Sequence, residues 1–141
     1  MEKRYRTSAH TKHRLVFHIV FRPKYRKRVL RYNLAKRAKE LFKQCCCVND
    51  WIIHEIEIMP NHVHILIQIN PRDSIAYVMQ LLKGGSSKVI RDEFPELEEF
   101  LWGDSFWSEG YFAESIGKVA ENAVRKYISQ QNKQLNRDHG L

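Results

Sequence analysis

The chain has few cysteines, and their arrangement excludes two common scaffolds. The three cysteines are consecutive, at positions 45–47, and neither their odd number nor their spacing suits a disulfide framework or a zinc ribbon. Long apolar runs are also missing: none approaches the ~20 residues of a membrane-spanning helix, and residues 1–14 contain no apolar signal core. With 141 residues, 43% of them hydrophobic, the sequence predicts one cytoplasmic domain over residues 1–141, with no membrane partner.

Acidic residues are scarce in the first third of the chain. Only Glu2 and Glu40 lie at or before Lys43, whereas 15 of the 24 Lys and Arg residues fall in that segment, and the whole chain carries a net charge of +8. Such clustering favours a polyanionic partner, most commonly nucleic acid. The alternative is a solvated basic face that serves solubility. Residues 1–12 are expected to form a mobile basic arm.

The stretch over residues 59–69, Met-Pro-Asn-His-Val-His-Ile-Leu-Ile-Gln-Ile, joins a tight turn to an alternating pattern. Successive strand residues point to opposite faces, so His62 and His64 share a face while Val63 and the alternate isoleucines face the core. Two imidazoles on one face of a strand provide half of a metal site. The alternative is a strand with two exposed or hydrogen-bonded histidines, because so short a motif also arises by chance.

The remaining elements are predicted from periodicity and turn signals. A central strand is expected over residues 13–21, where both faces are apolar and Pro23 follows. A strand over 51–59 should place Glu55 and Glu57 on the same face as Ile53. The other expected elements are a helix over 30–47, a strand over 62–70, a helix from 75, one or two short strands within 106–113, and a helix over 118–134.

Two polar segments are candidate phosphate contacts. In residues 22–28 five cations surround Tyr25, a mixture that suits phosphate neutralisation combined with base stacking. In residues 83–88 a lysine and small side chains interrupt the expected helix, and a renewed helix start can hold phosphate through its backbone N–H groups. The alternatives are an ordinary surface loop and a simple helix break or kink.

The last expected helix, over residues 118–134, carries a tyrosine and a glutamine that are candidate site residues. Tyr127 and Gln131 are four residues apart, so they share a helix face. Gly117, just before this helix, is a candidate hinge. Taken alone, Tyr127 is better explained as a core or interface aromatic, which is the usual role of a tyrosine at this spacing.

In combination, these segments resemble the small single-tyrosine HUH transposases of the insertion-sequence two-hundred and six-hundred-and-five group. The resemblance runs in order from about residue 9 to residue 133. Asn61 is a departure, because this family often has aspartate before the first histidine. The matching segments are Phe17–Leu30, Met59–His64, Leu82–Ser87, Leu101–Trp102, Tyr111–Phe112 and Tyr127–Gln131.

The resemblance implies an α+β fold. This is a ferredoxin-like, or RRM-like, antiparallel sheet with helices on one face, plus a C-terminal helix that carries the catalytic tyrosine. The expected order strand–helix–strand–strand–helix–strand agrees with it. The resemblance also implies that His62, His64 and Gln131 bind Mg²⁺ or Mn²⁺, and that Tyr127 is the nucleophile that forms a 5′-phosphotyrosine intermediate.

The partners implied by the resemblance are single-stranded DNA with hairpin ends and a second copy of the chain, whose tyrosine helix can complete the metal site. Three other functions stay open: a domesticated palindrome-processing relative, a hydrolytic nuclease, and a non-catalytic nucleic-acid-binding module. The candidate DNA contacts are Arg14, Arg22, Lys24, Tyr25, Arg26, Lys27, Arg28, Lys83, Ser86 and Ser87.

Overall fold

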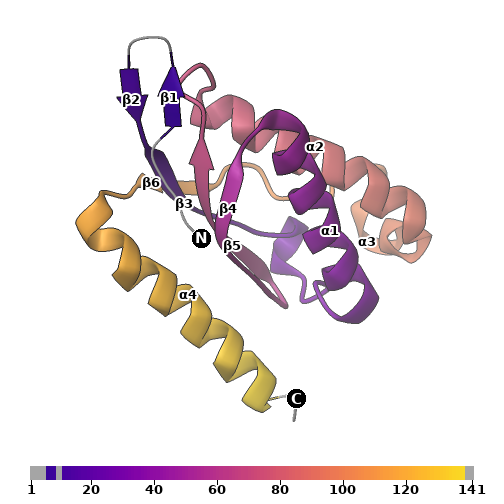
Figure 1. Ribbon diagram of the computed structural model, residues 1–141. Coiled ribbons are helices and arrows are strands. Elements are labelled where there is room, and N and C mark those ends of the chain that lie inside the picture. Colours follow the sequence, from indigo (N-terminus) through magenta and orange to yellow (C-terminus); the bar gives the residue numbers. More distant parts are fainter. Residues whose placement is uncertain (1–5, 9–10, 139–141) are drawn as a thin grey trace.

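The computed structural model describes the backbone of residues 6–8 and 11–138, and the side chains of residues 14–131 (Figure 1). In chain order its elements are β1 (Arg6–Ser8), β2 (Thr11–His13), β3 (Leu15–Phe21), η1 (Lys24–Arg26), α1 (Tyr32–Asn49), β4 (Ile52–Met59), β5 (His62–Ile69), α2 (Ile75–Glu93), η2 (Pro95–Leu97), α3 (Glu98–Leu101), β6 (Phe112–Ser115) and α4 (Lys118–Asp138).

Four strands form one antiparallel sheet in the order β4–β5–β3–β6. Together with the crossovers through α1 and α2, this order is the ferredoxin-like arrangement predicted from the sequence. β3 is a central strand, as predicted, because it pairs with β5 on one side and with β6 on the other. Its two apolar faces pack against the two cores of the fold. α1 and α2 pack on one face of the sheet, and α4 crosses the other (Figure 1).

The main core lies between the sheet and α1 and α2. The odd-numbered residues of β5 from Val63 to Ile69 are at most 1% exposed and belong to this core, as the alternation predicted. At its centre the ring of Phe21 lies 4.8 Å from Trp107 and 5.5 Å from Phe42, centroid to centroid. Burying each such side chain contributes about 1.5–3 kcal/mol. Core packing therefore explains Trp107.

A second, smaller core lies under α4. Val16, Leu66 and Ile116 on the opposite face of the sheet meet Ile128, which is fully buried. Leu66 shares its face with His64, so this cluster fixes α4 beside the histidine strand.

The prediction for β4 was wrong on the facing of its carboxylates. The register shifts between Ile53 and Glu55, where a bulge at His54 interrupts the pairing with β5. A bulge inserts one residue and reverses the alternation beyond it. Ile53 therefore stays on the core face, whereas Glu57 is paired with His64 on the other face.

The expected interruption of the helix at residues 83–88 was also wrong, because α2 runs without a break from Ile75 to Glu93. Leu82, Ser86 and Ile90 continue its buried stripe, while Gly84 and Gly85 lie on the exposed side. Burial of that stripe overrides the weak helix propensity of the glycine pair.

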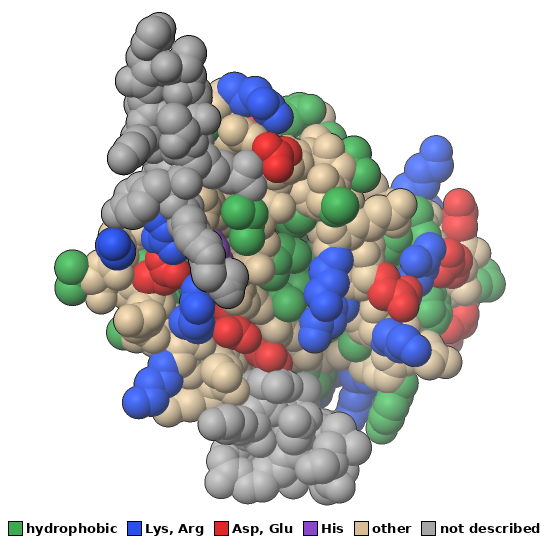
Figure 2. Space-filling view, in the orientation of Figure 1, with side chains coloured by type: hydrophobic (Ala, Val, Ile, Leu, Met, Phe, Trp, Pro, Cys, Tyr) green, Lys and Arg blue, Asp and Glu red, His purple; other side chains and the backbone are tan. Residues whose placement is uncertain are grey.

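The N-terminal arm differs in part from its prediction. Residues 6–8 and 11–13 form a hairpin, β1 with β2, and the other arm residues lie outside the described part. Of the strands expected within 106–113, Trp107 contributes a single bridge to Pro23, and β6 begins at Phe112. Among the described helices, none is long and apolar enough to cross a bilayer. Figure 2 shows cationic and acidic side chains interspersed over one face.

Candidate active site

Three histidines gather on the sheet face that α4 crosses. The ring centroids of His62 and His64 lie 4.8 Å apart, and His18 of β3 stacks on His64 at 5.3 Å with the ring planes 12° apart. The alternation of β5 accounts for the first pair. Antiparallel pairing of β3 with β5 adds the third ring, because it places His18 opposite Leu66 on the same face as His64.

One ring nitrogen of each motif histidine has a protein partner. Nδ1 of His62 lies 2.8 Å from Oδ1 of Asn61, and Nδ1 of His64 lies 3.0 Å from Nε2 of His18. An amide oxygen only accepts, so His62 donates from Nδ1 and keeps a lone pair on Nε2. Asn61 therefore orients His62 through its amide oxygen. The Nε2 atoms remain as ligand atoms, which is the arrangement that metal-binding histidines have.

Both motif histidines are held in the neutral form. Burial and the neighbouring His62, His18 and Arg22 lower the pKa of His64 to about 4. Burial, with the guanidiniums of Arg22 and Arg28, lowers the pKa of His62 as well. A neutral imidazole offers a lone pair to a metal ion. The two neutral imidazoles thus fit a divalent cation as ligands.

Tyr127 lies directly beside this cluster. Its ring meets that of His64 edge-on, with centroids 5.7 Å apart and planes at 82°, and the side chain is 48% exposed. Its ring therefore lies next to the histidines with about half of the side chain open to solvent. In this chain the tyrosine helix thus approaches the histidines of its own sheet.

An ion pair complements the apolar contact that holds α4. Glu121 is buried, and its carboxylate is bound by Arg14, just before β3, and by Arg125 at 2.9 Å. The hydrogen bond from Arg14 lowers the pKa of Glu121. Arg14, a predicted DNA contact, is therefore placed in the joint between α4 and the sheet.

Gln131 lies one helical turn after Tyr127 and is half-buried. In the described part of the chain, no hydrogen bond joins it to either motif histidine. No set of three His, Cys, Asp or Glu side chains there is placed to hold a metal ion. A cation at the two histidines would therefore need Gln131, water or phosphate oxygens as further ligands.

The basic loop is exposed and contains two residues in the left-handed backbone region. Tyr25 and Arg26 both have positive φ, of 61° and 52°, a conformation rare in residues with a Cβ. Tyr25 is 65% exposed and packs its ring edge on Phe100, over which Nζ of Lys27 lies at 5.2 Å. The other predicted contacts of this loop differ in exposure: Arg26 and Arg28 are exposed, Arg22 is half-buried, and Lys24 pairs with Asp104 at 3.2 Å.

Three predicted phosphate contacts on α2 have internal partners. Lys83 donates from Nζ to the carbonyls of Ser108 and Gly110, both at 2.8 Å. Ser86 accepts from Nε1 of Trp107 at 2.8 Å, and Ser87 accepts from the backbone N–H of Phe106 at 2.9 Å. Both serines are buried. This segment therefore positions the loop after α3, and its two buried serines are not accessible to DNA in this structure.

His18 and Phe112 are site residues that the sequence interpretation did not identify. His18 contacts His64, and the exposed ring of Phe112 meets His18 edge-on at 5.9 Å. The only signal for His18 was a polar residue within an otherwise apolar strand. Its partner could be found only from the pairing of β3 with β5.

A ferredoxin-like sheet that presents a histidine pair to a tyrosine on a C-terminal helix is the arrangement expected of a single-tyrosine transposase. The family model described as "Transposase IS200 like" matches residues 11–131. The chain therefore belongs to the IS200-like transposase family.

Known relatives agree with this assignment. The chain is 29% identical over 120 residues to the ISDra2 transposase TnpA of Deinococcus radiodurans, covering 85% of this chain and 86% of that protein. It is 31% identical over 123 residues to the transposase for insertion sequence element IS200 of Salmonella typhimurium, covering 87% and 80%.

Two solved structures share the fold. A crystal structure of a candidate transposase from Deinococcus radiodurans R1 has a TM-score of 0.72 at 26% identity, covering 94% of this chain and 98% of that one. The REP-associated tyrosine transposase bound to a REP hairpin has a TM-score of 0.64 at 13% identity, covering 99% and 75%.

Proposed function

We propose that the protein cleaves and rejoins single-stranded DNA at insertion-sequence ends, as one transposase domain, with Tyr127 as the nucleophile. The observation that carries this proposal is the contact between the half-exposed ring of Tyr127 and His64. Family membership supplies the reaction class, and this contact supplies the pairing of nucleophile and phosphate-binding residues.

The proposed chemistry is a balanced transesterification. The phenol of Tyr127 gives up its proton and its oxygen attacks phosphorus, the bond between phosphorus and the 3′ oxygen breaks, and the leaving oxygen takes up one proton to become a 3′-hydroxyl. A 5′-phosphotyrosine ester remains. Attack on this ester by a second 3′-hydroxyl reseals DNA and returns the phenol, so no external energy source is consumed.

His62 and His64, together with Gln131, would hold Mg²⁺ or Mn²⁺, and the bound cation would neutralise charge on the scissile phosphate. His18 and Asn61 keep the two imidazoles oriented through their Nδ1 atoms. Arg22, just after β3, adds positive charge next to the two histidines.

The proposed DNA partner carries hairpins at its ends. A structural neighbour is bound to a REP hairpin, and this chain offers Tyr25, Lys27 and Arg28 on an exposed loop. Exposed cations next to an exposed ring suit a folded single strand, because phosphates and an unpaired base can be bound together.

We also propose that the working form is a homodimer, as the family resemblance implies, with active sites that two chains can share. Size-exclusion chromatography with light scattering tests this directly. A mass that stays near 16.8 kDa over the whole range of protein concentrations, with and without DNA, contradicts the dimer.

A covalent-trapping assay tests the catalytic proposal. Full-length protein is incubated with single-stranded oligonucleotides from the flanks of its gene, with Mg²⁺ or Mn²⁺, and then denatured. We expect a protein–DNA adduct that is lost in Tyr127→Phe and in His64→Ala. Tyr77→Phe, another exposed tyrosine, and His54→Ala, another half-buried histidine of the sheet, are the matched controls and should retain the adduct.

Each alternative has its own outcome in this assay. Cleavage without an adduct would identify a hydrolytic nuclease and leave Tyr127 as a packing residue. Binding without cleavage on every flank would favour a non-catalytic module. Adduct formation on repeated palindromes rather than on the gene's own flanks would favour a domesticated relative.

A further inference from the structure

A straight row of side chains leads from the histidine cluster to the edge of the sheet. His64 is paired with Val20, and Val20 is paired with Phe112. Directly paired residues share a face, so all three lie side by side on the face away from α1 and α2. Two strand spacings, roughly 10 Å, separate Phe112 from His64.

Phe112 is a large apolar strand residue that is 51% exposed. Its ring meets that of His18 at 5.9 Å with the planes 71° apart, so the two rings are not stacked face to face. An exposed aromatic face on a sheet is where single-stranded nucleic acids stack their bases in RRM-type domains.

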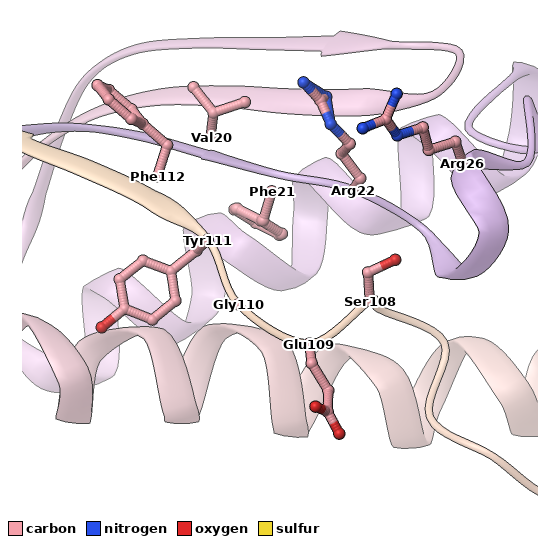
Figure 3. Close-up of a pocket in the computed structure, with 9 residues that line it drawn as sticks. All are labelled: Val20, Phe21, Arg22, Arg26, Ser108, Glu109, Gly110, Tyr111 and Phe112. Carbon is pink, nitrogen blue, oxygen red and sulfur yellow. The ribbon is translucent and has the colours of Figure 1, made fainter.

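A pocket of about 430 Å³ opens beside this ring. Arg22 and Arg26 extend from the end of β3 and from η1 toward the same side as Val20 and Phe112 (Figure 3). The only acidic side chain that lines it, Glu109, points the opposite way (Figure 3). An apolar ring next to two guanidiniums is complementary to a base joined to its phosphate.

The backbone of the pocket is fixed before any ligand arrives. The N–H of Ser108 donates to the carbonyl of Arg22 at 2.9 Å, and its hydroxyl donates to that of Pro23 at 3.0 Å. Lys83 binds the carbonyls of Ser108 and Gly110 from the α2 side. A preorganised loop loses little conformational entropy on binding.

We propose that this surface is a nucleotide subsite: a base next to the scissile phosphate stacks on Phe112, and Arg22 and Arg26 bind its backbone phosphate. The ligand class is single-stranded DNA. The proposal rests on the proposed function for the position of the scissile phosphate. The stacking of a base on Phe112 and the binding of its phosphate by Arg22 and Arg26 do not depend on that function.

Tyr111 provides a matched control for Phe112. It precedes Phe112, also lines the pocket and is comparably exposed at 42%, but its ring points away from Phe112 and the two arginines, to the side where Nζ of Lys83 lies 5.9 Å from it (Figure 3). Removing either ring deletes similar aromatic area, but only one of the two lies on the face of the histidines.

The test measures binding of fluorescein-labelled octathymidylate to full-length protein by anisotropy, in EDTA so that no cleavage occurs. We expect Phe112→Leu to weaken binding roughly five- to hundredfold, the range for loss of one base–aromatic stack. Phe112→Trp should bind like wild type, and Tyr111→Leu should change the affinity less than twofold. Arg26→Gln should make the salt dependence shallower by about 0.7, whereas Phe112→Leu should not.

A cross-linking measurement needs no variant, so it stays decisive if Phe112→Leu fails to fold. Octathymidylate containing 5-iodouracil is irradiated with wild-type protein, and cross-linked peptides are mapped by mass spectrometry. Attachment at Phe112 supports the subsite. Attachment elsewhere only, unchanged affinity of Phe112→Leu, equal losses in Tyr111→Leu, or no binding by wild type overturns it.

The two proposals fail in distinguishable ways. A Tyr127 adduct together with unchanged binding by Phe112→Leu removes the subsite and leaves the function. Phe112-dependent binding without any adduct removes the function and leaves a single-strand binding surface.

Discussion

At the scale of single residues, the site depends on side chains that touch the motif histidines from other strands. His18 bonds Nδ1 of His64 and stacks on its ring. If His64 is to use Nε2 as a ligand atom, its Nδ1 must carry the proton and donate the hydrogen bond, which Nε2 of His18 accepts. His18 is therefore a positioning residue, set in place by the register of β3 against β5.

We predict that His18→Phe weakens Mn²⁺ binding about 10- to 100-fold, because the buried Nδ1 of His64 loses its partner. Titration of Mn²⁺ followed by electron paramagnetic resonance measures this. In addition, ¹⁵N spectra of the metal-free protein should show the Nδ1–H tautomer of His64 in wild type and a mixture of the two tautomers in the variant. His54→Phe replaces another half-buried histidine of this sheet and should keep the wild-type affinity for Mn²⁺. Equal losses of affinity in both variants would contradict a specific positioning role for His18.

Glu57, opposite His64 on β4, gives a pH-dependent prediction. Burial raises the pKa of its carboxyl from 4.5 to about 7, against the smaller opposing effect of Lys39. The folded protein then holds this proton more tightly than the unfolded chain, so its stability falls as pH rises from about 4.5 to 7. Glu57→Gln should therefore raise the free energy of unfolding at pH 8 by on the order of 1–3 kcal/mol, and by much less at pH 5.

Urea unfolding in EDTA at the two pH values measures this gain. Glu55→Gln, two residues earlier on the same strand and less buried, is the control and should gain less at pH 8. A Glu57→Gln advantage that is equal at pH 5 and pH 8 would point to packing rather than ionisation.

At the scale of elements, strict alternation was predictable and its interruptions were not. The core face of β5 follows directly from the positions of Val63, Ile65 and Ile67. The bulge at His54 has no comparable local signal, because it is fixed by pairing with β5, and it brings Glu57 to the histidine face. Similarly, the glycines of α2 indicated a break, but burial of the stripe through Leu82 and Ser86 keeps the helix continuous.

The continuity of α2 leads to two predictions, one of a higher and one of a lower free energy of unfolding. A Cβ added at Gly84 would meet nothing within 4 Å, so Gly84→Ala should raise the free energy of unfolding by about 0.5–1 kcal/mol. Ser86→Ala removes the acceptor of the buried Trp107 indole N–H and should lower it by about 1–3 kcal/mol. Urea unfolding measures both. A loss of stability in Gly84→Ala would indicate that the helix is interrupted there after all.

The joint of α4 makes the next prediction. Arg14→Gln leaves the buried carboxylate of Glu121 with Arg125 as its remaining ion-pair partner among the described side chains, so the free energy of unfolding should fall by roughly 1–3 kcal/mol at pH 7. Because the pKa of Glu121 is lowered in the folded state, the contribution exists above its ordinary pKa and is lost as pH falls. Arg37→Gln, which breaks an exposed pair with Glu93, should matter much less.

Hydrogen exchange distinguishes local from global effects of Arg14→Gln. Amide protection should fall first in α4, while β3 and β5 keep theirs. Unchanged protection of α4 would show that the apolar contact of Ile128 holds the helix without the ion pair.

At the scale of the whole molecule, the sequence located the excess of positive charge but not the surface that uses it. Two groups of described cations in the first third of the chain lie on different elements. Those of residues 22–28 follow β3, near the histidines, whereas those of α1 belong to the helix that packs on the opposite face of the sheet from α4, with Lys39 and Lys43 beside the edge strand β4 (Figure 1). If the basic loop binds DNA, equal changes in net charge on the two sides should have unequal effects.

Two triple variants with the same loss of charge test this. Replacing Arg26, Lys27 and Arg28 with Gln should make the slope of log K against log salt for single-stranded DNA shallower by about 2. Each phosphate contact that is removed no longer releases a counterion on binding. Replacing Lys36, Lys39 and Lys43 of α1 with Gln should leave the slope nearly unchanged. Anisotropy titrations of one labelled oligonucleotide at several salt concentrations give both slopes. Equal reductions would show that the positive charge acts as a diffuse field over the whole molecule, and that the loop has no privileged contact with DNA.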